Sequence, residues 1–306
     1  MATNKPSVFI DGEAGTTGLG IRARLEKLAS VDLKSLPEAH RKDAAARRDM
    51  MAEVDLVVLC LPDDAAREAT ALADSLGNAA PKLLDGSNAH RIDIAWEYGF
   101  PEMVPGQGER IAGARKVSNP GCYPTGAIGL IRPLVDAGLI PADYPITINA
   151  VSGYSGGGKS MIAAHDGAGG PAFELYALGL EHKHMAETQK YGGLSRRPIF
   201  VPSVGHFRQG MLVSVPLHLD TLPGKATGAD LRAVLAERYK RSVYVSVVEP
   251  AGKLEPEALN DTNKLELSVH ANEARHQAVL VARLDNLGKG ASGAAVQNLS
   301  LMLGLD

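Results

Sequence analysis

The fold is decided by the stretch VFIDGEAGTTG at residues 8–18, where an apolar run leads into a glycine-rich turn and then a helical pattern. The glycines stand at G-x-x-G-x-x-G spacing. Glycine permits a tight turn and lets the backbone approach a pyrophosphate, which rests on the helix N-terminus. The spacing departs from the usual G-x-G-x-x-G, so a turn between packed elements is the alternative. We expect dinucleotide contacts at Gly12, Gly15, Thr16, Thr17 and Gly18.

Strand and helix patterns alternate through the first third of the chain. Apolar runs typical of strands lie at 8–10, 31–36, 55–61 and 82–85, and helical spacing lies between them at 21–28, 39–53 and 63–76. This β-α-β-α-β order predicts an α/β fold with a Rossmann-type, doubly wound parallel sheet.

After residue 121 the character of the sequence changes, because strands predominate. They are expected at 146–151, 199–204, 211–219, 243–248, 265–271 and 277–284, with one helix at 228–240. Along 265–271 apolar and polar residues alternate, which is typical of a sheet with one buried face. The final stretch returns to helical spacing, and we expect this helix to return to the first domain. We therefore predict a nucleotide-binding domain at 1–120 plus 286–306 and an α+β domain at 121–285.

Composition argues against several classes of protein. The chain has 306 residues, a formal net charge of −3 and no long basic run, so no nucleic-acid partner is expected. Its longest apolar runs are far too short for a bilayer, so no membrane partner is expected. Its first residues contain no secretory core, so secretion is not expected. The two cysteines, Cys60 and Cys122, do not suggest a disulfide framework, and a reduced cytoplasmic compartment fits best. Cys60 falls inside a strand pattern and is interpreted as a buried, inert thiol.

Cys122 stands in the run SNPGCYPTG at 118–126, between the turn-forming pairs Pro-Gly and Tyr-Pro. An apolar helical pattern begins at Ala127. At a helix N-terminus, the dipole and the backbone N–H groups favour a thiolate and can hold an oxyanion. The pattern is typical of a cysteine nucleophile that forms thioesters. A cysteine packed in a loop is the alternative.

Two histidines and an acid follow in the run EHKHMAE at 181–187. On a helix, His184 and Glu187 would share a face, which favours His184 as a general acid–base group. A metal site usually needs more ligands than this run offers, so no metal is expected. Surface histidines are the alternative.

The cofactor preference depends on the end of the second predicted strand. In dinucleotide-binding domains an acid there binds the ribose hydroxyls, whereas basic residues accept a 2′-phosphate. Here His-Arg-Lys at 40–42 follows the strand, with Glu38 as the one acid nearby. We therefore predict NADP, with Arg41 as a contact; a solvated helix face is the alternative. Two further glycine-rich tracts are expected to form loops of the site. The tract 152–160 is expected to surround an anion with backbone N–H groups, and the tract 286–293 to close over a cofactor; flexible connections are the alternative for both.

Five motifs together resemble the N-acetyl-γ-glutamyl-phosphate reductase family in its shorter form. They are GEAGTTGLGI at 12–21, DGSNAHR at 85–91, SNPGCYPTG at 118–126, EHKHMAE at 181–187 and DNLGKGASGAAVQN at 285–298. The resemblance implies a Rossmann domain, a catalytic and dimerisation domain, NADP(H), a homodimer or homotetramer and a cytoplasmic location. Longer members carry Pro-His in a later strand loop, where this chain has the run 201–208, so the role of His206 stays open.

The resemblance also implies a reaction, the NADPH-dependent reduction of N-acetyl-L-glutamyl 5-phosphate to N-acetyl-L-glutamate 5-semialdehyde and phosphate in arginine biosynthesis. Cys122 would form a thioester, and His184 would take and return its proton. The other candidate contacts are Arg91, Asn119, Ser155, His182 and Arg208 for the substrate and Asn286 and Lys289 for the cofactor. A reductase of aspartyl or aminoadipyl phosphate would use the same motifs. A non-catalytic NADP-binding regulator is the alternative from another class, and the position of Cys122 argues against it.

Overall fold

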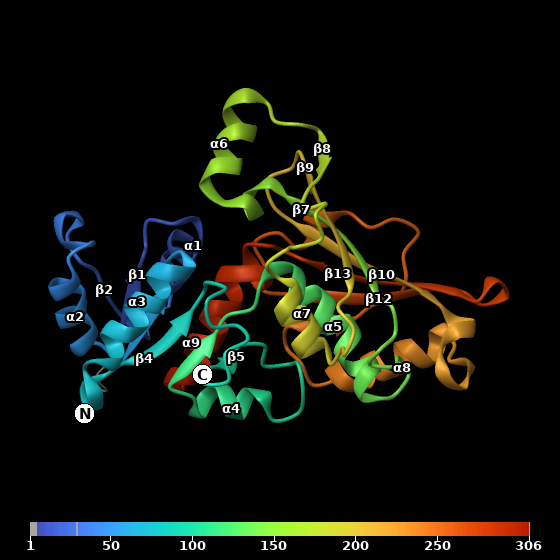
Figure 1. The fold of residues 1–306 in the computed structure, drawn as a ribbon, viewed down its shortest axis with the longest axis horizontal. Coiled ribbons are helices and arrows are strands. Elements are labelled where there is room, and N and C mark those ends of the chain that lie inside the picture. The colour runs from blue at the N-terminus through green and yellow to red at the C-terminus, as the bar shows by residue number, and fades with distance from the viewer. Residues whose placement is uncertain (1–4, 29, 306) are drawn as a thin grey trace. The chain divides into compact units, whose positions relative to one another are not determined.

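The computed structural model describes residues 5–28 and 30–305. Positions 1–4, 29 and 306, which include both ends of the predicted first domain, lie outside the described residues. The chain divides into two compact units (Figure 1). Unit 1 comprises Met1–Pro101, Gly106–Pro120 and Ala291–Asp306, and unit 2 comprises Glu102–Pro105 and Gly121–Gly290. Among the helices of the described residues, none combines the length and the apolar character that a membrane span requires.

Unit 1, in the described part of the chain, is built on a six-stranded sheet whose neighbouring strands run parallel. The order is β2 (Asp32–Lys34), β1 (Ser7–Asp11), β3 (Leu56–Leu59), β4 (Lys82–Asp85), β6 (Lys116–Ser118) and β5 (Glu97–Tyr98). Every residue of β3 is buried, as expected when helices cover both faces of a parallel sheet. The predicted α/β fold with a doubly wound parallel sheet is confirmed.

Helices lie on both sides of this sheet (Figure 1). They are α1 (Thr16–Leu25), α2 (Ala44–Ala52), α3 (Asp63–Asp74), α4 (Gln107–Gly113) and α9 (Gly293–Leu303), with 3₁₀ turns at Glu38–His40 and Gly77–Ala79. Alternate side chains of β1 enter different cores: Val8 and Ile10 pack with α1, α4 and α9, whereas Phe9 packs with α2 and α3. Because Leu299 and Met302 of α9 lie in the first of these cores, the predicted return of the last helix to the first domain is confirmed.

Unit 2 contains a seven-stranded mixed sheet within the described residues. Its order is β11 (Val245–Val247), β12 (Leu265–Asn272), β13 (Gln277–Leu284), β10 (Met211–His218), β7 (Thr147–Gly153), β9 (Ile199–Gly205) and β8 (Phe173–Leu175). The helices are α5 (Cys122–Asp136), α6 (Gly158–Ala168), α7 (Met185–Gly192) and α8 (Gly228–Tyr239). Short helical turns lie at Tyr154–Gly157, Leu219–Thr221, Pro223–Lys225, Pro256–Leu259 and Glu273–Arg275, and one more, Gly288–Ser292, spans the boundary with unit 1. α5 and α8 pack against the central strands β10, β12 and β13.

Some segments differ from the sequence prediction. The predicted helix at 39–53 is divided, because Asp43 accepts hydrogen bonds from the backbone N–H groups of Ala45 and Ala46 and caps α2. The tract 152–160 contains the end of β7 and the start of α6 rather than one continuous loop. The prediction lacks β5 and β8, which have two and three residues and are too short for a periodic pattern. It also lacks β6, α4 and α6.

Candidate functional site

The glycine-rich turn of unit 1 packs closely against neighbouring backbone. Gly12 follows β1 with a φ of +88°, and a Cβ atom there would lie 2.4 Å from the carbonyl oxygen of Cys60. A Cβ atom on Gly18 would lie 2.8 Å from Cα of Glu13. The run 15–17 supplies the N-cap and first residues of α1. Both glycines are therefore required for the backbone path of this turn, which leads from β1 to the start of α1.

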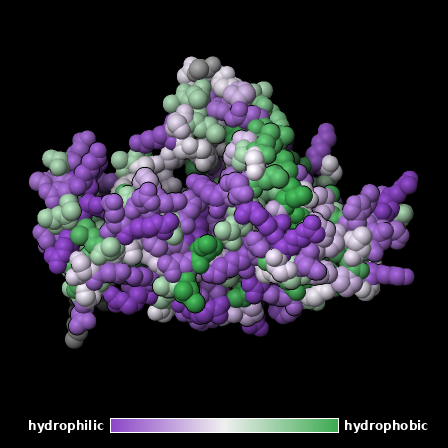
Figure 2. Space-filling model, in the orientation of Figure 1, coloured by the Kyte–Doolittle hydropathy of each residue, from purple (hydrophilic) through white to green (hydrophobic). Residues whose placement is uncertain are grey.

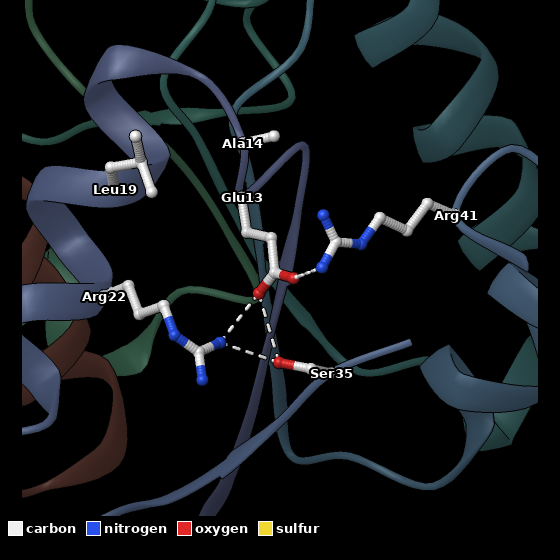
Figure 3. A pocket seen from close by; sticks show the side chains of 6 residues that line it. All are labelled: Glu13, Ala14, Leu19, Arg22, Ser35 and Arg41. Carbon is white, nitrogen blue, oxygen red and sulfur yellow. Dashed lines mark hydrogen bonds and ion pairs between the residues drawn. The ribbon is translucent and has the colours of Figure 1, made fainter. Parts of the chain in front are cut away.

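Two pockets adjoin this turn within unit 1. The larger, of about 670 Å³, is lined by residues of β1, the turn, the segment 36–47 and the start of α3. The smaller, of about 480 Å³, is lined by Glu13, Ala14, Leu19, Arg22, Ser35 and Arg41 (Figure 3). We call the smaller one the arginine pocket. Glu13, Ala14 and Arg41 line both pockets, and Lys42 lines the larger.

The carboxylate of Glu13 is the centre of the arginine pocket. It accepts hydrogen bonds from Nη1 of Arg22 at 2.7 Å, Nη2 of Arg41 at 2.6 Å and the hydroxyl of Ser35 at 3.1 Å. Nη1 of Arg22 also donates to Oγ of Ser35 at 2.7 Å. The predicted Arg41 thus lies among donors that suit an anion.

Arg22, Ser35 and Glu13 are absent from the sequence prediction. Ser35 directly follows β2, which is a usable signal. The local sequence pattern indicates neither Arg22 nor Glu13, because Glu13 contacts Arg22 nine positions away and Ser35 22 positions away. Within the described residues, no group of three or more His, Cys, Asp or Glu side chains is arranged to hold a metal ion.

Cys122 is the first residue of α5, and Gly121, with extended backbone, is the N-cap. The thiol therefore belongs to the end of the helix where the dipole and the first N–H groups favour a thiolate. Gly290 packs closely against this residue, since a Cβ atom on the glycine would lie 2.9 Å from Cβ of Cys122. By contrast, burial raises the pKa of the Cys60 thiol to about 12, which makes Cys60 a poor nucleophile near neutral pH.

Tyr123, next in the chain, faces both histidines of the predicted acid–base run. Its ring centroid lies 5.9 Å from that of His182 and 6.0 Å from that of His184, and the two imidazole centroids are 4.7 Å apart. The backbone N–H of His184 donates to Nδ1 of His182 at 3.2 Å, so a neutral His182 carries its proton on Nε2. Burial raises the pKa of Tyr123 far above its usual value, so its phenol stays neutral.

α7 places an acid beside the start of α5. Glu187, in the first turn of α7 and 1% exposed, accepts a hydrogen bond from the backbone N–H of Gly121 at 3.1 Å. His184 was expected inside this helix, but the structure places it at the N-cap, because α7 begins at Met185. The structure thus brings both histidines and Glu187 to the N-terminus of the helix that carries Cys122.

Ser155 and Asn286 form a hydrogen-bonded cluster in unit 2. Nδ2 of Asn286 donates to Oγ of Ser155 at 3.0 Å, and Oδ1 of Asn286 accepts from the backbone N–H of Gly210 at 2.8 Å. The backbone N–H of Ser155 donates to the carbonyl of Arg208 at 3.0 Å. The Arg208 side chain is exposed and lies 3.4 Å from the carboxylate of Asp166. Asn286, expected in the first domain, therefore belongs to unit 2 with two predicted substrate contacts.

Lys289, expected in the first domain as a cofactor contact, is buried in unit 2. Its Nζ lies 3.0 Å from each carboxylate oxygen of Glu102 and 5.2 Å from the ring centroid of Tyr244. Burial lowers the pKa of Lys289 below its ordinary value. This ion pair holds the segment Glu102–Pro105 to unit 2, and the cofactor contact stays a prediction.

Arg91 and Asn119 contact each other in unit 1. Nε of Arg91 donates to the carbonyl of Asn119 at 3.0 Å, and its guanidinium also donates to Oδ1 of Asn88 at 2.8 Å and the carbonyl of Gly86 at 3.2 Å. Oδ1 of Asn119 accepts from Asn298 of α9 at 3.0 Å. These bonds fix the end of β6, and the predicted substrate contacts of both residues stay predictions.

Sequence comparison identifies close relatives along nearly the whole chain. The family model of the semialdehyde dehydrogenase dimerisation domain matches residues 122–286. An N-acetyl-gamma-glutamyl-phosphate reductase of Burkholderia cenocepacia is 52% identical over 308 residues, which cover 98% of this chain and 97% of the relative. N-acetyl-gamma-glutamyl-phosphate reductase 2 of Pseudomonas putida is 52% identical over 307 residues, with the same two coverages.

Solved structures of similar fold include aspartate semialdehyde dehydrogenases. The type II enzyme of Vibrio cholerae, complexed with ASA, has a TM-score of 0.73 at 16% identity and covers 99% of both chains. The Candida albicans enzyme with NADP has a TM-score of 0.68 at 14% identity, covering 99% of this chain and 100% of that one. At these identities the likeness shows the fold alone.

Proposed function

The chain belongs to the N-acetyl-γ-glutamyl-phosphate reductase family and is an oxidoreductase, and from this premise we propose that it performs the family's reaction with NADPH. The proposed substrate is N-acetyl-L-glutamyl 5-phosphate, and the products are N-acetyl-L-glutamate 5-semialdehyde and phosphate, in arginine biosynthesis. The observation that carries the proposal is Cys122 at the start of α5. Its two chain neighbours contact the run 181–187: Gly121 donates to Glu187, and the Tyr123 ring centroid lies 6.0 Å from that of His184. We place this activity in the cytoplasm.

In the proposed reaction the Cys122 thiolate attacks the acyl carbon, so that a C–S bond forms while the C–O bond to phosphate breaks. His184 takes the thiol proton before the attack and later returns a proton. When bound, NADPH supplies the hydride that reduces the thioester carbonyl. The N–H groups at the start of α5 stabilise the oxyanion of the thiohemiacetal on Cys122. Its collapse breaks the C–S bond and releases the aldehyde, and His184 returns the proton to the Cys122 thiolate.

NADP(H) is proposed from the chemistry of unit 1. Gly12 and Gly18 leave a cradle that side chains would fill. The arginine pocket offers two guanidinium groups and a hydroxyl, and these donors suit the 2′-phosphate that distinguishes NADP from NAD. The larger pocket, which shares Arg41, is proposed to hold the adenosine.

The substrate carries a phosphate and a carboxylate, which need cationic or N–H donors. We propose that Arg208, whose side chain is exposed, and Ser155 bind one of these anions. His182 would donate from Nε2, because its Nδ1 already accepts a hydrogen bond. Arg91 and Asn119 are retained as candidates for the other anion.

A homo-oligomer is proposed through the face of the unit 2 sheet opposite α5 and α8. The strand registers place on one continuous face the side chains of Phe173, Leu175, Ile199, Val201, Val151, Leu212, Val281 and Val279. Phe173, Leu175 and Ile199 are 58%, 48% and 52% exposed, and Figure 2 shows hydrophobic side chains gathered in the region of β8. A second copy of the chain is the proposed occupant, because the matching family model describes a dimerisation domain.

Light scattering after size-exclusion chromatography tests this interface. The double variant Leu175→Glu/Ile199→Glu should have a smaller mass than the wild type, because buried carboxylates oppose apolar packing. Val243→Glu is the matched control, since Val243 is an 84% exposed apolar residue outside this face. A monomeric wild type, or a double variant of unchanged mass, would contradict the assignment.

The activity is tested by phosphate-dependent reduction of NADP⁺ with N-acetylglutamate, aspartate and aminoadipate semialdehydes. The first substrate should be preferred. Cys122→Ser should lose turnover and keep NADPH binding, because a hydroxyl is a far weaker nucleophile than a thiolate. Preference for another semialdehyde would assign the enzyme to another acyl phosphate. Cofactor binding without turnover of any of the three would favour a regulator.

A further inference from the structure

The arginine pocket already contains an anion supplied by the chain itself. Figure 3 shows the Glu13 carboxylate between the side chains of Arg22 and Arg41, with the Ser35 hydroxyl below it. One carboxylate oxygen lies 2.6 Å from Arg41, and the other lies 2.7 Å from Arg22 and 3.1 Å from Ser35. The Glu13 side chain is 11% exposed, whereas those of Arg22 and Arg41 are 34% and 41% exposed. The two cations therefore remain accessible to an anion from solution.

The position of this pocket gives the contact a specific meaning. Ser35 directly follows β2, and Glu13 lies inside the glycine-rich turn, so the pocket is at the end of the second strand, where a dinucleotide places its adenosine ribose. A carboxylate near that ribose would favour NAD if it accepted the hydroxyl groups. Here both of its oxygens are engaged by guanidinium groups, the same donors that a 2′-phosphate needs.

We propose that Glu13 is an internal counter-anion that competes with the 2′-phosphate of NADP(H) for Arg22 and Arg41. This inference rests on the proposed function and deepens it. In the unliganded protein the carboxylate satisfies the two arginines. On binding, the more highly charged phosphate takes over the guanidinium groups, and the Glu13 side chain turns away. Glu13 therefore sets the preference between NADP and NAD by competition rather than by a ligand contact.

Competition predicts that removal of the Glu13 charge strengthens binding, and only for ligands with a 2′-phosphate. Isothermal titration calorimetry would compare 2′,5′-ADP with 5′-AMP on the wild type and on Glu13→Gln. Glu13→Gln removes the two partly exposed ion pairs that Glu13 makes with Arg22 and Arg41. The affinity for 2′,5′-ADP should therefore increase roughly ten-fold. Binding of 5′-AMP should stay within about two-fold of the wild type, because this ligand has no 2′-phosphate to compete with Glu13 for the two guanidinium groups.

Glu26→Gln is the matched control. Glu26 also pairs with Arg22, at 2.9 Å, but its side chain is 55% exposed and it does not line the pocket. This variant should leave the affinity for both ligands nearly unchanged. Arg41→Ala in the Glu13→Gln background should remove most of the gain for 2′,5′-ADP, which shows that the gain acts through the arginine.

The results distinguish this inference from the proposed function. Weaker binding of 2′,5′-ADP to Glu13→Gln, or an equal gain for 5′-AMP, overturns the inference while NADPH binding by the wild type is retained. A wild type that binds neither NADPH nor 2′,5′-ADP overturns both. Thermal unfolding of each variant identifies any change that comes from misfolding, and a folded Glu13→Gln with unchanged affinities also overturns the inference.

Discussion

Gly290→Ala should disable the nucleophile without any change to a reacting group. A Cβ atom at this position would lie 2.9 Å from Cβ and 3.3 Å from Cα of Cys122, and 3.1 Å from the carbonyl oxygen of Asp285. All three neighbours are fixed to the backbone. They cannot rotate away as the end of a flexible side chain would.

The size of the effect follows from these distances. Carbon atoms in contact are normally about 3.5–4.0 Å apart, so Cys122 and the new methyl group must separate by roughly 0.6–1.1 Å. Such overpacking costs about 1–3 kcal/mol of stability. A displacement of this size at a reacting atom can reduce turnover about a hundred-fold.

The assay combines turnover with alkylation of Cys122 by iodoacetamide, followed by mass spectrometry. Cys60 provides little background, because its pKa is raised to about 12. NADPH binding should persist, since the glycine-rich turn belongs to unit 1. Gly252→Ala is the control, as a Cβ atom there meets nothing within 4 Å. A folded Gly290→Ala with wild-type turnover and alkylation rate would show that Cys122 tolerates the added methyl group and would contradict this prediction.

Three further predictions concern residues already described. His184→Asn should slow acylation of Cys122 at neutral pH, and its activity should partly recover as pH approaches the ordinary cysteine pKa of ~8.5. His182→Asn should reduce activity less. If the pH–rate profile shifts only for His182→Asn, the roles of the two histidines must be exchanged. Arg41→Ala should raise KM for NADPH more than for NADH, and equal use of both cofactors by the wild type would contradict NADP preference. Lys289→Met should lower the free energy of unfolding by about 3–5 kcal/mol in urea at neutral pH, because Glu102 stays buried without its cation. Because burial lowers the pKa of Lys289, the unfolded state binds more protons than the folded state at pH values between that pKa and ~10.4. The wild type should therefore gain stability relative to Lys289→Met as pH rises through this window. Unfolding free energies of the two proteins that change in parallel with pH would contradict the lowered pKa of Lys289.

The parts of the fold that depend on local pattern could be predicted from the sequence. The apolar run before Gly12 and the helical spacing after it define β1 and α1, because the turn leaves few other paths. The helix after the Pro-Gly pair could also be predicted, although α5 begins at Cys122, five residues before the predicted start of the apolar pattern at Ala127. In each case neighbours in the sequence supply the physical constraint.

Contacts between distant segments could not be predicted in this way. Lys289 stands in a glycine-rich run that suggests a cofactor loop, but its structural partner, Glu102, is 187 positions away. Arg22 occupies an ordinary helical position, and it gains its role only from the path of the turn that carries Glu13. Periodicity indicates which face of an element is buried but not which charge lies opposite.

The two ends of the chain share one core, and this has a consequence for biosynthesis. Val8 and Ile10 of β1 pack with Leu299 and Met302 of α9, whereas unit 2 lies between them in the sequence. The ribosome therefore releases all of unit 2 before it releases α9. Domains usually complete their folding in order from the N-terminus. Here a nascent chain that stops before residue 293 holds every segment of unit 2 but leaves the core of unit 1 open to solvent.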